Sequence, residues 1–276
     1  MKKKLILCAV LVACVSAAAV LIFVINNKSG NTSESESADI SKVTYSTVRM
    51  IEEKSNTEES SYCVGADLSG SDFSNLSETI TDKIKQEWDT YEGLTEMQRI
   101  ASSKAWGTVG HQCDTWAECE EAIGISVDNP LESVDWLIKT SHYGFGSDRS
   151  KHILVTASTQ KDRTPNRINI GTSYYVGAMR ITLTATLTSN SEEYSTGSAI
   201  TGYADFVQTN TQTGKGIPVL IVTPDEANNL GYYSEDYYAP VAYWVKDNVF
   251  YSVRVLGNDT NKEQIHATLG KILAEF

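Results

Sequence analysis

The first feature in the hydrophobic pattern is an uninterrupted apolar run from Leu5 to Ile25. It contains 21 residues without a charge, and the lysines at positions 2–4 precede it. As a helix it would be about 31 Å long, close to the roughly 30 Å hydrocarbon core of a bilayer. The apolar part of a cleaved signal spans only about 7–15 residues. We therefore expect residues 1–25 to form a cytoplasmic stub and a transmembrane signal anchor, with the lysines inside.

The pattern then becomes almost entirely polar. Residues 26–61 are rich in Ser, Asn and Glu, and residues 26–39 hold Ala38 as their only apolar residue. Such a segment buries too little apolar surface to offset its loss of conformational entropy. We expect a flexible acidic tether over 26–61, followed by one extracytoplasmic domain over 62–276.

Apolar residues recur at helical spacing in the first part of this domain, from about 74 to 138. One stripe runs along a single predicted helix face: Leu76, Ile80, Ile84, Trp88 and Tyr91. Asn75 and Glu78 predict the start of that helix, and Thr95 with Gln98 forms a second capping box. A third helix is expected from Thr115 to Gly124, and Asn129-Pro130 opens a further turn.

From about residue 150 the apolar period changes to two. Residues 180–188 read RITLTATLT, which predicts an antiparallel strand with one wet face. Two further strands meet at Asp247-Asn248, a two-residue hairpin signal. Thr260 and Glu263 then form a capping box for an amphipathic last helix. The predicted fold class is α+β: an anchor, a tether, a helical segment, and a meandering antiparallel sheet over 150–276 closed by a C-terminal helix.

Two sequences carry a resemblance to a known family: AECEEAIGI at 117–125, and AYWVKDNVFYSVRV at 242–255 followed by an amphipathic helix. With Trp244 and Tyr251 at their spacing, residues 115–276 resemble the domain-of-unknown-function 4367 family. The resemblance implies an extracytoplasmic domain behind a single membrane span in a Gram-positive bacterium. The family has no accepted catalytic residues, so the resemblance assigns none to this chain.

The charge balance limits the partners. The chain has 23 basic and 35 acidic residues, for a net charge of −12. Three of the basic residues and none of the acidic ones precede residue 26, so the exported part carries −15. This surface repels nucleic acid, and we expect none as a partner. A protein or a cell-wall ligand fits better, beside the membrane that Leu5–Ile25 would span.

Three of the five cysteines lie beyond the apolar run. Cys113 and Cys119 are close enough in sequence to form a local disulfide, and three free thiols are the alternative. Within the apolar run, Leu11 to Cys14 matches a lipobox. Cys14 is therefore a candidate lipidation site, although the strongly apolar residues after it favour an uncleaved span.

No motif in the chain predicts catalysis, and we expect no cofactor and no metal. The clearest candidate contact surface is an aromatic loop with four tyrosines, Tyr232, Tyr233, Tyr237 and Tyr238. Tyrosine provides a large contact area at low entropic cost, which suits recognition of a protein or a carbohydrate. The opposing interpretation is that these rings cover the edge of the sheet. The sequence thus predicts a non-enzymatic binding or sensing domain at the cell membrane, with an envelope hydrolase or a structural envelope component as alternatives.

Overall fold

A computed structural model describes residues 48–53, 61–102, 104, 106–140, 151–189, 192–195, 200–201, 207–223 and 237–276. The expected anchor at Leu5–Ile25, with Cys14, lies outside the described residues, as do Tyr232 and Tyr233. Within the described residues, no helix is both long enough and apolar enough to span a membrane. All of these residues belong to one compact unit, Tyr45–Phe276.

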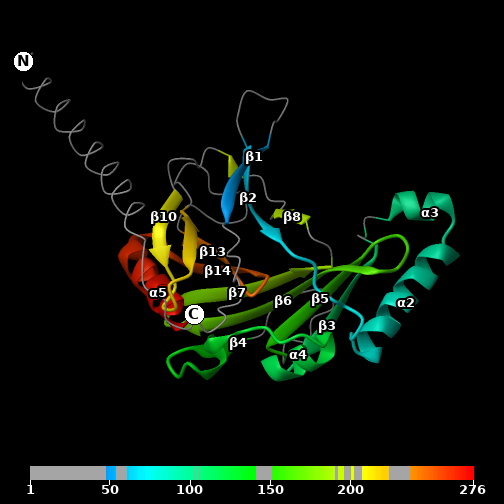
Figure 1. The fold of residues 1–276 in the computed structure, drawn as a ribbon, viewed down its shortest axis with the longest axis horizontal. Coiled ribbons are helices and arrows are strands. Elements are labelled where there is room, and N and C mark those ends of the chain that lie inside the picture. The colour runs from blue at the N-terminus through cyan, green and yellow to red at the C-terminus, as the bar shows by residue number, and fades with distance from the viewer. Residues whose placement is uncertain are drawn as a thin grey trace, which may run out of the picture. The chain divides into compact units, whose positions relative to one another are not determined.

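A ten-stranded antiparallel sheet organises this unit (Figure 1). Its main path runs β10-β11-β13-β14-β7-β6-β5-β3, with β12 beside β14 and β4 beside β6. The strands are β3 (Thr108–Cys113), β4 (Ile138–Thr140), β5 (Ile153–Thr159), β6 (Pro165–Val176), β7 (Met179–Thr188), β10 (Val207–Gln212), β11 (Pro218–Val222), β12 (Tyr237–Tyr238), β13 (Val241–Lys246) and β14 (Val249–Asn258). In a meander each strand pairs only with the strands next to it in the sequence. The sheet departs from the predicted meander, because β14 pairs with β13 and also with the distant strand β7.

The alternation predicted for β7 is confirmed over its first part, where Ile181 and Leu183 are fully buried and Thr182 and Thr184 on the other face are half-buried. The predicted wet face does not continue to the end of the strand, because Thr186 and Thr188 are buried. The hairpin between β13 and β14 is also confirmed. Asp247 and Asn248 both have positive φ angles, as the favoured two-residue hairpin turn requires.

Helices contribute to the hydrophobic core on one face of the sheet. The helical elements are α2 (Glu78–Gly93), α3 (Glu96–Ala101), α4 (Trp116–Ile123), the 3₁₀ turns η1 (Pro130–Ser133) and η4 (Asp259–Asn261), and α5 (Lys262–Glu275), and of these α3 buries no residue. Ile80, Ile84 and Trp88 of α2 join the same core as Ile265 and Leu269 of α5. The predicted α+β class and the closing helix are confirmed.

Details of the helix starts differ from the predictions. Thr95 and Gln98 do form the capping box of α3, and Gly124 ends α4 with a positive φ. However, Ser77 rather than Asn75 precedes α2. The predicted box at the start of α5 is absent, because the side chain of Asn258 instead accepts a hydrogen bond from the Thr260 backbone. Local competition between nearby polar side chains decides such cap positions.

β3 and β1 (Arg49–Glu53) lie in segments for which the sequence predicts a different structure. β3 falls inside the range expected to be helical, 74–138, and it pairs with β5 at the edge of the sheet. A smaller sheet contains β1, β2 (Ser61–Leu68), β8 (Glu192–Ser195) and β9 (Ile200–Thr201). Because β1 pairs with β2, ordered structure begins within the predicted tether rather than at residue 62.

The smaller sheet packs on the second face of the large one. Val64 and Leu68 of β2 share a separate hydrophobic core with Leu220 of β11 and Phe250 of β14. Both faces of this half of the large sheet are thus covered by apolar contacts.

Candidate functional site

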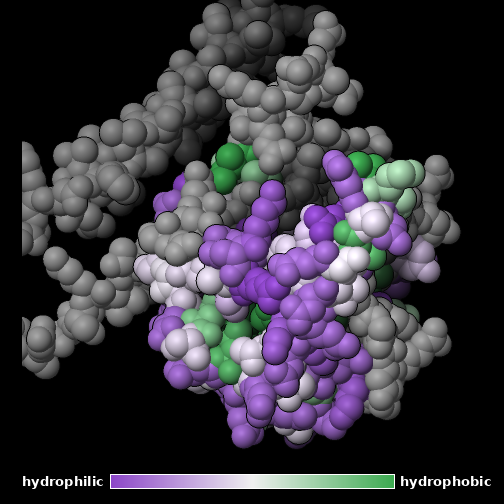
Figure 2. Space-filling view, turned by 90° about the vertical axis from the view of Figure 1, so that its right-hand side faces the viewer, coloured by the Kyte–Doolittle hydropathy of each residue, from purple (hydrophilic) through white to green (hydrophobic). Residues whose placement is uncertain are grey.

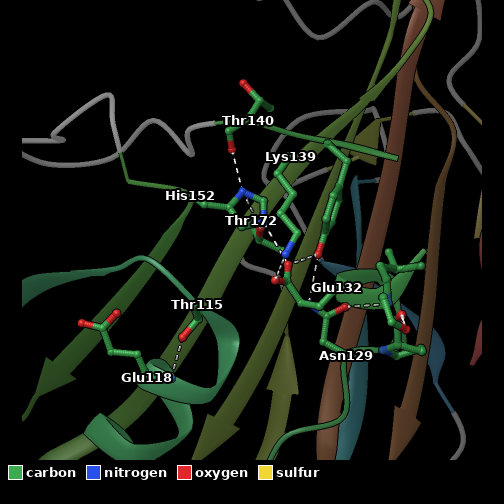
Figure 3. Close-up of polar contacts among 12 residues, drawn as sticks. Thr115, Glu118, Asn129, Glu132, Lys139, Thr140, His152 and Thr172 are labelled. Carbon is green, nitrogen blue, oxygen red and sulfur yellow. Dashed lines mark hydrogen bonds and ion pairs between the residues drawn. The ribbon is translucent and has the colours of Figure 1, made fainter. Parts of the chain in front are cut away.

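A polar cluster around Glu132 joins four elements beneath the helical face (Figure 3). Glu132 Oε1 accepts hydrogen bonds from Tyr174 Oη at 2.7 Å and from His152 Nε2 at 2.9 Å. Its second oxygen, Oε2, accepts from Lys139 Nζ at 2.7 Å. η1, β4, β6 and the residue before β5 therefore meet at one carboxylate.

The histidine in this cluster does not form a catalytic relay. In a relay, one ring nitrogen faces the acid and the other faces the nucleophile. Here His152 Nε2 faces both Glu132 and the hydroxyl of Thr172, the latter at 3.0 Å. His152 Nδ1 instead contacts the backbone oxygen of Thr140 at 2.9 Å. Thr172 is also fully buried, so its hydroxyl cannot reach a substrate.

The electrostatics of the cluster keep Glu132 ionised. Burial alone would raise its pKa, but the hydrogen bonds from His152, Lys139 and Tyr174 outweigh burial and lower the pKa to about 2. Burial and the charge of Glu132 raise the pKa of Tyr174. A permanently charged carboxylate with three donors stabilises the junction of these elements and has no proton to give.

An open pocket of about 480 Å³ adjoins this cluster, and we call it the Asp128 pocket. It lies between the segment after α4 and the β13–β14 hairpin, and its lining residues are Trp116, Glu120, Ser126, Val127, Asp128, Asn129, Asp247, Val249 and Tyr251. Asn129 links the pocket to the cluster, because its Nδ2 donates to Tyr174 Oη at 3.0 Å.

Hydrogen bonds hold the pocket wall in place. Glu120 Oε1 accepts from Ser126 Oγ at 2.8 Å and from the Val127 backbone N–H at 2.7 Å. Trp116 Nε1 donates to the Val127 backbone oxygen at 2.6 Å. The wall is thus fixed before any ligand arrives, which reduces the entropic cost of binding.

Negative charge gathers in this pocket. Burial would raise the pKa of Asp128, but the hydrogen bonds from Lys246 and Lys215 outweigh it, and the pKa lies below its usual value. Burial, together with the charges of Asp128 and Asp247, raises the pKa of Tyr251 in the pocket floor. Three carboxylates, those of Glu120, Asp128 and Asp247, line the pocket, and Asp128 is paired with Lys246 and Lys215.

The structure places two of the four predicted tyrosines. Tyr237 is 46% exposed and remains a candidate contact residue. Tyr238 is only 9% exposed, and its hydroxyl lies 2.8 Å from His266 Nε2. The side chain of Tyr238 therefore packs against α5 and belongs to the hydrophobic core.

Cys113 and Cys119 do lie together, at the end of β3 and within α4. Both are buried free thiols. A hydrogen bond to Cys113 and burial raise the pKa of the Cys119 thiol. The disulfide between them stays a prediction for oxidising conditions.

Comparisons with known proteins add nothing to this picture. No family model, no curated protein and no solved structure matches the chain. The resemblance to the domain-of-unknown-function 4367 family accordingly stays a prediction.

Proposed function

We propose that the protein is a non-enzymatic binding or sensing domain, held outside the cell membrane by Leu5–Ile25. The apolar run, the acidic tether and the preformed Asp128 pocket support this proposal. A polar wall fixed in advance above an aromatic floor is typical of ligand sites.

The observation that carries the proposal is the geometry of the Asp128 pocket. Glu120 accepts hydrogen bonds from Ser126 Oγ and from the Val127 N–H, which hold the wall in place, and Tyr251 lines the pocket beside Asp128 and Asp247. A wall that is ordered in advance lowers the entropic cost of binding a ligand.

The exposed carboxylate of Asp247 at the edge of the pocket favours ligands that carry an ammonium group. To test this, we would titrate the unit Tyr45–Phe276 with lysozyme-solubilised cell-wall fragments, which bear free amines, and follow binding by NMR. We expect shifts at pocket residues, and at least about fivefold weaker binding for Asp247→Asn, because one charge is lost. Asn accepts the positive φ at this position, so the hairpin turn is preserved.

The matched control is Asp135→Asn, at an exposed residue outside the pocket. Mass spectrometry of the recovered fragments separates binding from hydrolysis. Cleaved fragments would favour the hydrolase alternative, and an absence of shifts at the pocket would contradict the proposal.

A further inference from the structure

A second recess, separate from the Asp128 pocket, lies between α2 and the edge strand β3. Its volume is about 360 Å³, and we call it the α2–β3 groove. One stripe of α2 forms its wall with Lys83, Glu87 and Thr90, and residues 108–110 of β3 form its floor. Figure 2 shows the side of the molecule that carries α2 and α3, where the described surface is mostly hydrophilic with small hydrophobic areas. This surface suits polar recognition rather than the docking of an apolar helix.

The floor of the groove presents backbone groups. Thr159 N donates to Gly107 O at 2.8 Å, so the odd-numbered residues of β3 share hydrogen bonds with β5. Thr108 and Gly110 consequently direct their N–H and C=O groups away from β5, toward α2. Lys83 Nζ donates to Gly110 O at 2.8 Å, which agrees with this direction.

A buried carboxylate oxygen in the wall also lacks a partner. The side chain of Glu87 is only 10% exposed, and its Oε2 pairs with Lys104 at 2.5 Å. Its Oε1 is buried and has no hydrogen-bond partner among the residues that the structure describes. Leaving a buried acceptor without a hydrogen bond is unfavourable, and more so when the group is charged.

Protection of a sheet edge by lysine is a common device, and it accounts for Lys83. It does not account for an unsatisfied buried oxygen on Glu87, which a ligand's hydrogen-bond donor would satisfy. An edge with regularly spaced backbone donors and acceptors matches the main chain of an extended peptide.

We infer that the α2–β3 groove binds an extended peptide segment of a partner protein as an added strand on β3, with a donor side chain facing Glu87. This goes beyond the proposed function, because it assigns a protein partner to a surface distinct from the Asp128 pocket. The main chain of the peptide pairs with Thr108 and Gly110, and a side-chain N–H or O–H group satisfies Glu87 Oε1.

The test uses the full-length protein in detergent micelles and a synthetic library of capped eight-residue peptides, with affinity measured by fluorescence anisotropy. Gly110→Pro removes an outward N–H group without removing a hydrogen bond to β5, so the variant keeps its pairing with β5. We expect this variant to bind the selected peptides at least about tenfold more weakly, equal to about 1.4 kcal/mol. Hydrogen exchange should show protection of residues 108–112 when peptide is bound.

A second pair of variants keeps the test decisive if Gly110→Pro fails to fold. Glu87→Gln should weaken binding, whereas Asp82→Asn, on an exposed position of the same helix, should leave it unchanged. An absence of binders tighter than about 1 mM would overturn the inference. Binding that is unaffected by Gly110→Pro, or that leaves residues 108–112 unprotected, would overturn it as well.

Discussion

Glu132 shows how one side chain determines the arrangement of several elements. Its carboxylate accepts hydrogen bonds from His152, Lys139 and Tyr174, which come from three different strands or their flanks. Removing the carboxylate of Glu132 takes away the charged acceptor of all three donors, and the loss of these hydrogen bonds lowers the stability of the folded protein.

We predict that Glu132→Gln lowers the free energy of unfolding by about 2 kcal/mol at pH 7, measured by urea denaturation. The control is Glu121→Gln, at an exposed position of α4, with an expected change within about 0.5 kcal/mol. The folded pKa of Glu132 is about 2, below its ordinary value of 4.5. Its stabilisation is therefore complete above about pH 4.5 and lost as the pH falls toward 2. The difference between wild type and variant should shrink over that window, and a difference constant with pH would contradict this assignment.

The sequence does not reveal this cluster or the pocket beside it. Glu132, His152 and Tyr174 are separated by 20 and 22 positions, and no local spacing relates them. The nearest sequence signal is Asn129-Pro130, which predicts the turn but not its partners. The loop with four tyrosines is a clearer pattern in the sequence than the Glu132 cluster, yet Tyr238 is buried and packs against His266. Contacts between residues far apart in the sequence form the site, and the periodicity of apolar residues does not predict such contacts.

At the scale of elements, periodicity predicts α2, α4, α5, β7 and the β13–β14 hairpin well. It misses β3, because an edge strand that packs against a helix on one side need not alternate cleanly. Close approaches between elements are also hidden from the sequence. Gly214, in the turn between β10 and β11, donates its N–H to Leu273 O near the end of α5 at 2.8 Å.

We predict that Gly214→Ala destabilises the protein by about 2 kcal/mol, because its Cβ would collide with the Ala274 carbonyl oxygen. Gly93→Ala is the matched control, since a Cβ there meets nothing within 4 Å. The control should be neutral or stabilising by up to about 1 kcal/mol, because Ala is the better helix former. Thermal unfolding followed by circular dichroism distinguishes the two. Equal melting temperatures would show that α5 does not depend on this contact.

At the scale of the molecule, β14 connects the two halves of the large sheet. One edge pairs with β13, and through it with β11 and β10, whereas the other edge pairs with β7, β6, β5 and β3. Val253 lies opposite Ala242 on one side and Leu183 on the other, and it is fully buried. The two halves should therefore unfold together.

We predict that Val253→Ala costs about 2 kcal/mol, and that tryptophan fluorescence and far-ultraviolet circular dichroism still report one coincident transition. Ser252→Ala, on the opposite face of the same strand, should cost much less. Two separate transitions in the variant would show that the halves are independent.

The central position of this late hairpin also has a kinetic consequence. The second edge of β7 pairs with β14, which lies about 70 residues further along the chain, so this edge stays unpaired until β14 is in place. Contacts between such distant segments slow folding and leave a strand edge open in the meantime. If the domain is exported from its N-terminal end, the first half of the sheet emerges well before the strand that completes it. During export the chain would therefore present an unpaired edge of β7, and protection of that edge against aggregation becomes part of the protein's biogenesis.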